Sequence, residues 1–324
     1  MTPSALIAGC GGYLPDLVLD NDALAARHGL DTSDAWIRER TGIRQRHIAA
    51  PNQTASDLGL EAARAALVDA GASAADVDCI LVATSTPDSA FPATAVRIQG
   101  KLGVTRGFAF DIAAACTGFV YALSVADSFI RTGQARGVLV IGTEVYSRIL
   151  DWTDRGTCVL FGDGAGAVFL RATEATPGGS GILSCHLHSD GRFGDILHVE
   201  GGAGSTGGAG LLRMAGKEVF RHAVTKLAAV VDEALTANGL GHGDVRWLVP
   251  HQANLRIIDA MGRKLHLPPE RVVVTVQRHA NTSAASIPLA LAEAVGDGRI
   301  RRGDLIVMEG IGGGLTWGAA LARF

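Results

Sequence analysis

The chain has 324 residues, of which 48% are hydrophobic and 19% charged, and its formal net charge is -3. This balance allows a large buried core, argues against disorder and gives no reason to expect nucleic acid as a partner. The five cysteines are irregularly spaced without a CxxC pair, which predicts neither a disulfide framework nor a zinc site. The N-terminus lacks a signal-peptide pattern, and no apolar run reaches the ~18 residues of a membrane span. We therefore expect a cytoplasmic protein with no membrane partner.

Apolar strand-like runs alternate with helical patterns along the whole chain. Residues 56–70 predict a helix, because Thr54 and Asp57 have capping-box spacing and Gly71 stands where a C-cap glycine is common. Residues 219–235 predict a second amphipathic helix. Four apolar runs read as buried strands: 80–82, 138–141, 248–249 and 305–308. This alternation predicts an α/β fold with mostly parallel strands.

An internal repeat divides the chain. Residues 66–77 are matched in order by residues 234–245, Gly137 and Leu139 are matched by Gly303 and Leu305 at nearly the same offset, and residues 162–167 resemble residues 312–320. We interpret this as two duplicated halves, 1–174 and 175–324, with the boundary at the Pro- and Gly-rich turn 176–180. Chance similarity between two Ala- and Gly-rich helices is the alternative.

Cys116 is the first candidate for chemistry. It follows a strand-like run and precedes an amphipathic helix, so it lies at the positive end of a helix dipole, which favours the nucleophilic thiolate. The repeat places Asn281 at the corresponding junction of the second half. Because ligands in α/β folds bind at the carboxyl ends of strands, the site should lie between the halves. A buried structural role is the alternative for the cysteine.

Two polar residues are candidate partners for Cys116. His251 follows the strand that ends at Pro250, where it could donate a hydrogen bond or act as a base. Asn281 could donate its amide hydrogens to a developing oxyanion, or simply cap a helix. His186 and His188 lack further ligands, so no metal is expected. The glycine run 201–210 contains a dinucleotide-like fingerprint, but glycines continue where a helix should begin, and we interpret it as a surface loop.

Taken together, the motifs resemble the β-ketoacyl-acyl carrier protein synthase III family of the thiolase-like superfamily. The resemblance covers essentially the whole chain and rests on these segments: 31–34 with Trp36, 40–44, 113–116, 154–157, 161–166, 250–254, 281–286, and 312–314 before 316–318. It implies a five-layered αβαβα fold and a homodimer. It also implies that Cys116 is the acylated nucleophile, with His251 and Asn281 completing a catalytic triad.

The resemblance further assigns residues around the nucleophile. The backbone N–H groups of Cys116 and Gly314 would form an oxyanion hole. Trp36 and Arg155 would sandwich the adenine of coenzyme A. The remaining substrate-binding residues would be Thr32, Arg40, Gly156, Phe161, Phe220, Ala253 and Asn254.

Acyl selectivity and docking are assigned in the same way. The acyl pocket would be formed by Leu197, Leu212 and Phe91, the last reaching the partner subunit. The candidate docking surface for the acidic acyl carrier protein comprises Arg221, Arg256, Arg263 and Lys264. Arg256 and Arg263 are seven residues apart and so share one helix face. A solvated basic face is the alternative.

The implied reaction joins acetyl-CoA, or another short acyl-CoA, to malonyl-acyl carrier protein, with loss of carbon dioxide. It gives acetoacetyl-acyl carrier protein and would initiate type II fatty acid synthesis. Coenzyme A thioester is a substrate, and no cofactor is expected. Three alternatives stay open: a priming ketosynthase or acyltransferase of a polyketide- or quinolone-type pathway, a cysteine thioester hydrolase, and a non-catalytic binder of acyl-CoA.

Overall fold

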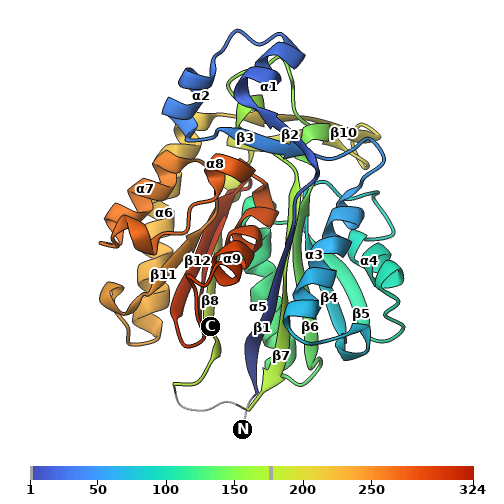
Figure 1. Cartoon of the computed structure of the whole chain (residues 1–324), viewed down its shortest axis with the longest axis vertical. Helices are drawn as coiled ribbons and strands as arrows, with labels where there is room; N and C mark the ends of the chain where they lie inside the picture. The colour runs from blue at the N-terminus through green and yellow to red at the C-terminus, as the bar shows by residue number, and fades with distance from the viewer. Residues whose placement is uncertain (1–2, 175–177) are drawn as a thin grey trace.

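A computed structural model describes residues 3–174 and 178–324 of the chain (Figure 1), so part of the predicted boundary between the halves lies outside the described residues. The strands are β1 (Ser4–Tyr13), β2 (Leu17–Asp20), β3 (Gln45–Ile48), β4 (Cys79–Ala83), β5 (Phe108–Ile112), β6 (Gly137–Glu144), β7 (Gly164–Thr173), β8 (Gly181–Ser189), β9 (Leu197–Gly202), β10 (Gly208–Met214), β11 (Trp247–Pro250), β12 (Leu305–Gly312) and β13 (Thr316–Arg323). The helices are α1 (Asn21–His28), α2 (Asp34–Thr41), α3 (Ala55–Asp69), α4 (Thr94–Leu102), α5 (Gly118–Arg131), α6 (Gly216–Ala237), α7 (Leu255–Lys264), α8 (Val276–His279) and α9 (Ser286–Gly296). The four predicted strands and both predicted helices are present. Thr54 and Asp57 form the expected capping box at the start of α3.

Two large sheets form the frame of the molecule. One has the strand order β1-β7-β6-β4-β5 and the other β11-β12-β13-β8. The prediction of mostly parallel strands is wrong, because β4 pairs in parallel with β5 and β6, and β11 with β12, while the remaining pairs in both sheets are antiparallel. For one of these pairs, β12 and β13, the connection explains the direction. Only three residues join β12 to β13, and a hairpin so short requires antiparallel strands.

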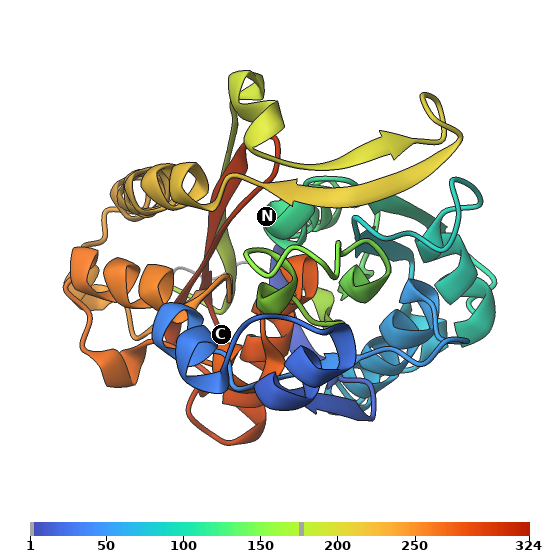
Figure 2. The ribbon, with the colours of Figure 1, turned by 90° about the horizontal axis from the view of Figure 1, so that it is seen from above.

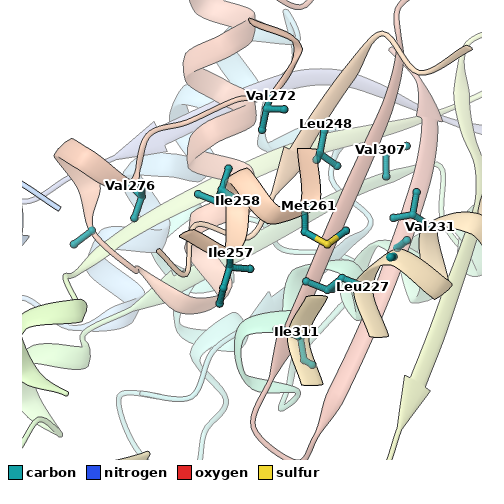
Figure 3. Close-up of a cluster of buried hydrophobic side chains, with 14 of the residues drawn as sticks. Leu227, Val231, Leu248, Ile257, Ile258, Met261, Val272, Val276, Val307 and Ile311 are labelled. Carbon is teal, nitrogen blue, oxygen red and sulfur yellow. The ribbon is translucent and has the colours of Figure 1, made fainter. Parts of the chain in front are cut away.

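The sheets and helices stack in five layers, as the resemblance implied. One buried cluster joins α3 and α4 to the outer face of the first sheet. A second joins α5 and α9 to the inner faces of both sheets. A third joins α6 and α7 to the outer face of the second sheet, and Figure 3 shows its side chains from α6, α7, β11 and β12 meeting in one group.

Glu309 is an unusual neighbour of this third cluster, because its side chain is ionisable. It lies on β12 between Val307 and Ile311, and since alternate residues of a strand share a face, its carboxyl points into the same apolar cluster. The side chain is 1% exposed and neither carboxyl oxygen has a hydrogen-bond partner among the described residues. Burial raises the pKa of Glu309 from an ordinary value of 4.5 to about 8. The carboxyl is therefore protonated in the folded protein at neutral pH.

The raised pKa predicts a pH-dependent stability. Between pH 4.5 and 8 the folded chain holds a proton that the unfolded chain releases, so the free energy of unfolding falls as pH rises through this window. Each unit of pKa difference is worth about 1.4 kcal/mol. Glu309→Gln removes the titration. We expect the variant to match the wild type near pH 5 and to exceed it by a few kcal/mol near pH 9. Urea unfolding at both pH values measures this, and an equal difference at the two pH values would contradict it.

Two small sheets lie at one end of the two large ones. β2 pairs with β3, and β9 with β10. The Gly-rich segment that resembled a dinucleotide fingerprint forms the turn between β9 and β10, which confirms its interpretation as a loop. Figure 2 shows this hairpin, in yellow, extending across the top of the molecule. Within the described residues, no helix combines the length and apolar character needed to cross a membrane.

Candidate active site

A cavity of about 1090 Å³ opens at the end of the sheets that carries the two small sheets. Cys116, His251 and Asn281 all line it, and their side chains are only 4%, 4% and 6% exposed. They come from three separate stretches of the chain: the turn after β5, the residue after β11 and the segment between α8 and α9. The cavity therefore gathers the three residues that the sequence singled out.

The backbone around Cys116 presents its thiol to the cavity. β5 ends at Ile112, and a turn of 3₁₀-helix at Ala115–Thr117 leads directly into α5. Ala115 has a φ of 46°, which is costly for a residue with a Cβ and so indicates a position fixed by its surroundings. The end of β12 packs against this turn. A Cβ on Gly312 would lie 2.6 Å from the Cys116 backbone nitrogen, so only glycine fits there.

The resting state of Cys116 differs from the sequence-based expectation of a thiolate. Burial raises the pKa of the thiol to about 12, and this effect exceeds the lowering by the Ser283 hydroxyl, which donates to Sγ at 3.4 Å. The charge of Glu144 raises the pKa further. The thiol is therefore protonated before substrate enters. The sequence placed the cysteine at a helix start but could not show how completely the two halves would bury it.

His251 is held as a neutral hydrogen-bond donor. It follows β11, and its Nδ1 lies 2.6 Å from the Ser286 hydroxyl. The Ser286 hydroxyl oxygen also accepts the Gln252 N–H at 3.2 Å, and among the described residues Nδ1 is the one acceptor that its own hydrogen reaches, which assigns Nδ1 as the acceptor of this bond. The second ring nitrogen, Nε2, then carries the proton. Burial lowers the pKa of His251 to about 4, so the ring is uncharged at neutral pH.

Asn281 is fixed in a similar way by backbone contacts. Its N–H donates to the Leu160 carbonyl at 2.9 Å, and its carbonyl accepts the Gly162 N–H at 3.0 Å. Its side-chain Oδ1 accepts the Ser283 N–H at 2.8 Å. This contact occupies the oxygen of the amide, which leaves Nδ2 to donate a hydrogen bond in the cavity.

A buried polar network surrounds Cys116 that the sequence did not reveal. The Ser283 hydroxyl bonds to the Tyr146 hydroxyl at 3.1 Å as well as to the thiol. The Tyr146 ring lines the cavity and stacks on Phe161 with ring centroids 4.9 Å apart. Beside them lies Glu144, whose carboxylate accepts from the Ser85 N–H and the Thr86 hydroxyl. Burial raises the pKa of Glu144 to about 7. Ser283 belongs to the segment 281–286 that carried part of the family resemblance. No sequence pattern, however, indicates that Tyr146 and Glu144 lie beside it.

Most of the other predicted site residues also line the cavity. They are Trp36, Arg40, Gly156, Phe161, Leu197, Leu212, Phe220, Ala253, Asn254, Arg256 and Gly314. At the mouth, the guanidinium of Arg40 lies 4.5 Å from the centre of the Trp36 ring, and that of Arg155 lies 5.4 Å from it. Arg155 is anchored by the Asp31 carbonyl and does not itself line the cavity.

The structure places five further predicted residues away from the cavity. Thr32 is half-buried beside α2, and its hydroxyl has no partner among the described residues. Phe91 is 84% exposed on the loop between β4 and α4. Arg221 lies on α6, while Arg263 and Lys264 lie in the last turn of α7, and all three are exposed. The predicted docking surface consists of the last three residues, Arg221, Arg263 and Lys264, together with Arg256. None of these four side chains makes an ion pair within residues 3–174 and 178–324.

The β9–β10 hairpin covers one side of the cavity. Its residues Val199 and Met214 line the cavity together with Leu197 and Leu212. The Leu212 N–H donates to the Ile149 carbonyl at 2.8 Å, which ties the hairpin to the first half. His198 and Lys217 add polar groups to the wall that the sequence analysis did not assign. Among the described residues, no three His, Cys, Asp or Glu side chains gather as metal ligands would.

Comparisons with known proteins agree with this geometry. Residues 110–191 match the family described as 3-oxoacyl-[acyl-carrier-protein (ACP)] synthase III, and residues 235–324 match its C-terminal family. The chain is 66% identical over 319 residues to the β-ketoacyl-[acyl-carrier-protein] synthase III of Acidiphilium cryptum, covering 98% of this chain and 99% of that one.

Solved structures give the same result. The 3-oxoacyl-[acyl-carrier-protein] synthase III of Aquifex aeolicus superimposes with a TM-score of 0.93 at 46% identity, over 99% of this chain and 100% of that one. The priming β-ketosynthase of the R1128 polyketide pathway superimposes with a TM-score of 0.91 at 37% identity, over 98% and 96% of the two chains. This chain therefore belongs to the 3-oxoacyl-[acyl-carrier-protein] synthase III family, a family of acyl-transferring condensing enzymes with the thiolase-like fold.

Proposed function

We propose that this protein condenses acetyl-CoA, or another short acyl-CoA, with malonyl-acyl carrier protein to give acetoacetyl-acyl carrier protein. The observation that carries the proposal is the convergence of Cys116, His251 and Asn281 on one enclosed cavity. A thiol supplies a nucleophile that can hold an acyl group. Two neutral donors beside it supply the means to stabilise an enolate.

The first step is transfer of the acyl group to Cys116. The sulfur attacks the thioester carbonyl, the bond to coenzyme A breaks, and the thiol proton ends on the departing sulfur. The Cys116 and Gly314 N–H groups hold the oxyanion, and the packing of Gly312, two residues before Gly314, against the Cys116 backbone supports this placement. The start of α5 adds the positive end of a helix dipole. These interactions offset the high pKa of the buried thiol as attack begins.

The second step is decarboxylation of the malonyl group. When its carboxylate leaves as carbon dioxide, the electron pair moves onto the thioester carbonyl, whose oxygen becomes negative. Neutral His251 donates to that oxygen through Nε2, and Asn281 donates through Nδ2. A buried carboxylate at either position would repel the charge. The carbanion then attacks acetyl-Cys116, forming the carbon–carbon bond and releasing the thiolate, which regains a proton from solvent.

The same geometry argues against a cysteine thioester hydrolase. Hydrolysis needs a base to activate water, and the base should have a pKa near the working pH. The pKa of His251 is lowered to about 4, and its Nδ1 is occupied by Ser286. Asn281 cannot act as a base at all. The cavity favours donation to an anion over removal of a proton from water.

Several further assignments belong to the proposal. Trp36 and Arg155 hold the adenine of coenzyme A at the mouth, with Arg155 moving outward to admit the base. The surface formed by Arg221, Arg256, Arg263 and Lys264 docks the acidic carrier protein, and the exposure of all four supports this. The reaction needs no cofactor. Five free cysteines, four of them buried, suit a reducing cytoplasm.

A homodimer is also part of the proposal. β5 is an edge strand of its sheet, so one row of its backbone groups has no strand partner within the described chain. Nearby, Phe108, Val96 and Phe91 are exposed to 37%, 41% and 84%. An uncovered strand edge with three large apolar side chains is suited to pairing with a second copy. In that arrangement Phe91 reaches the acyl pocket of the other subunit, beside its Leu197 and Leu212.

The acyl-CoA that the enzyme prefers as its first substrate distinguishes initiation of fatty acid synthesis from priming of a polyketide- or quinolone-type pathway. The 66% identity to a β-ketoacyl-[acyl-carrier-protein] synthase III, against 37% to a priming ketosynthase, favours fatty acid initiation. The test offers acetyl-, butyryl-, hexanoyl- and octanoyl-CoA separately with malonyl-acyl carrier protein and identifies each product by mass. Acetoacetyl-acyl carrier protein as the fastest product supports the proposal. A preference for octanoyl-CoA favours the priming alternative, and free acid in place of a β-ketoacyl product indicates a hydrolase.

The tautomer of His251 predicts an effect on condensation that can be measured separately from acyl transfer to Cys116. Ser286→Ala removes the hydroxyl that fixes the proton on Nε2, so the ring loses its orientation and part of its donor population. A lost hydrogen bond of about 1.4 kcal/mol corresponds to a tenfold slower condensation. Transfer of acetyl to Cys116 does not use this donor and should change less than twofold. Rapid-quench measurement of coenzyme A release and of acetoacetyl product separates the two steps, and equal slowing of both would refute the assignment.

A further inference from the structure

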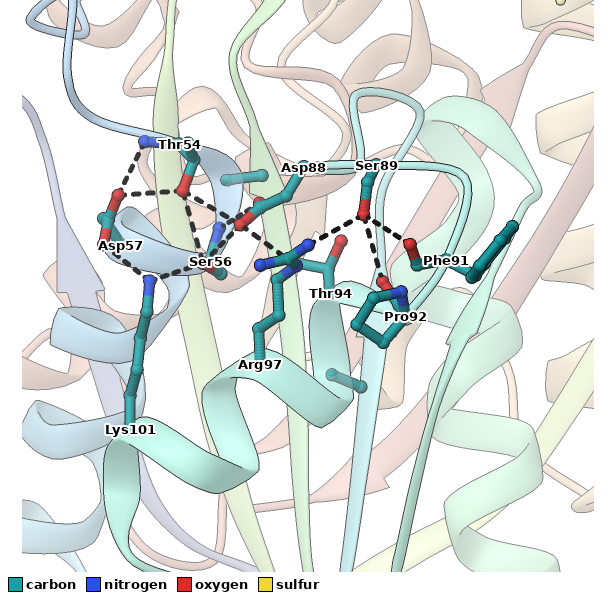
Figure 4. A network of polar contacts seen from close by, with 12 residues as sticks. Thr54, Ser56, Asp57, Asp88, Ser89, Phe91, Pro92, Thr94, Arg97 and Lys101 are labelled. Atoms are coloured by element: carbon teal, nitrogen blue, oxygen red, sulfur yellow. Dashed lines mark hydrogen bonds and ion pairs between the residues drawn. The ribbon is translucent and has the colours of Figure 1, made fainter. Parts of the chain in front are cut away.

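The loop that joins β4 to α4, residues 84–93, carries an apolar ring into solvent. Phe91 is 84% exposed, the largest exposure among the large hydrophobic side chains described. A loop with an exposed aromatic tip is expected to be mobile unless its backbone is anchored. The backbone of this loop is anchored by a network of charged and polar side chains that contains none of the catalytic residues (Figure 4).

Asp88 is the centre of that network. Its Oδ1 accepts the Ser56 N–H at 2.9 Å, and its Oδ2 accepts the hydroxyls of Ser56 and Thr54 at 2.6 and 3.0 Å. These donors belong to the first turn of α3, where unpaired N–H groups and the helix dipole favour an anion. Lys101 of α4 completes the group by donating to the Ser56 hydroxyl at 2.7 Å. The carboxylate is only 8% exposed, so its contacts are made with little competition from water.

The network continues from Asp88 to the tip of the loop. The guanidinium of Arg97 on α4 lies 3.9 Å from the Asp88 carboxylate and donates to the Ser89 hydroxyl at 3.0 Å. That hydroxyl donates in turn to the Phe91 carbonyl at 3.0 Å. Figure 4 shows the ring of Phe91 pointing away from this chain of contacts. The backbone of Phe91 is therefore held from two helices while its side chain stays free.

We propose that Asp88 is a positioning residue for acyl-chain selectivity: through Arg97 and Ser89 it holds Phe91 at the angle required to close the acyl pocket of the second subunit. The inference rests on the proposed function, in which Phe91 reaches that pocket. Asp88 itself touches no substrate. Displacing the ring by about an ångström opens the end of the pocket, so longer acyl chains gain relative to acetyl.

The test compares turnover of acetyl-CoA with that of hexanoyl-CoA by the intact protein. Phe91→Ala should lower the acetyl-to-hexanoyl ratio by about tenfold or more, since the ring is removed. Asp88→Asn should lower it by about fivefold, and Ser89→Ala, which leaves the α3 contacts intact, by about threefold. In the Phe91→Ala background, Asp88→Asn should change the ratio less than twofold, because the ring it positions is already absent. A merely destabilising substitution would not show this dependence on Phe91.

Asp78→Asn is the matched control. Asp78 lies directly before β4, whereas Asp88 lies in the loop after it. The Asp78 carboxylate accepts two backbone N–H groups, at 2.9 and 3.1 Å, and, like that of Asp88, it pairs with an arginine, here Arg106 at 3.1 Å. The control should lower the melting temperature without altering the ratio. If Phe91→Ala shifts the ratio and neither Asp88→Asn nor Ser89→Ala does, the positioning role is wrong. If Phe91→Ala itself leaves the ratio unchanged, the proposed placement of Phe91 in the second subunit fails, and the inference fails with it.

Discussion

Cys116→Ala should lower condensation by about 10⁴-fold or more while leaving decarboxylation of malonyl-acyl carrier protein measurable. The substitution removes the thiol that carries the acyl chain in the proposed reaction. The donors that stabilise the enolate are Nε2 of His251 and Nδ2 of Asn281, and both are held by contacts that do not involve the sulfur. Carbon dioxide release and acetoacetyl formation, measured in parallel, should therefore separate.

Cys185→Ala is the control for this variant. Cys185 lies on β8 and does not line the cavity. It should retain both activities. If Cys116→Ala loses decarboxylation as well as condensation, the sulfur itself assists the loss of carbon dioxide. That result would contradict the assignment of decarboxylation to His251 and Asn281 alone.

Asn281→Asp should be more damaging to condensation than Asn281→Ala. Alanine removes one donor to the enolate oxygen, a loss of about 3 kcal/mol or a hundredfold or more in rate. Aspartate keeps the oxygen that accepts the Ser283 N–H but replaces Nδ2 with a second oxygen, whose negative charge would face the developing enolate. Lowering the pH protonates that carboxyl and restores a donor, so the aspartate variant should recover partly as pH falls, while the alanine variant should not.

The acylation step serves as the internal reference for both variants. Transfer of acetyl from acetyl-CoA to Cys116 does not pass through the enolate, so burst release of coenzyme A should change less than severalfold. A variant that loses the burst as well would show that Asn281 supports the structure around Cys116. Aspartate performing better than alanine at pH 8 would contradict the role of a neutral donor.

Much of the fold followed from local sequence patterns. The capping box at Thr54 and Asp57, the helix after Cys116 and the strand before His251 are short-range features, and each lies where the periodicity indicated. The repeat also predicted that the junctions at Cys116 and Asn281 would meet, and both line one cavity. The roles assigned to these residues stay predictions until the variants are measured.

What the sequence could not supply depends on packing between distant segments. The protonated state of Cys116 follows from its burial by segments far apart in the chain, whereas its position at a helix start pointed to the opposite charge state. The same holds for the contact of Ser283 with Tyr146, which are 137 residues apart. The antiparallel pairs were not predicted, because a run of apolar residues identifies a buried strand but not its direction relative to its neighbours. No pattern marked Glu309 or Asp88, whose environments are assembled from several elements.

Intact-mass analysis of a single turnover shows directly whether Cys116 carries the acetyl group between the two steps. The protein is incubated with acetyl-CoA, freed of excess substrate, weighed, and then mixed with one equivalent of malonyl-acyl carrier protein. We expect a gain of one acetyl group on the wild type and none on Cys116→Ala, followed by loss of that group as an equal amount of acetoacetyl-acyl carrier protein appears. Acetyl released as free acetate, or an adduct that persists on the Cys116→Ala protein, would contradict it.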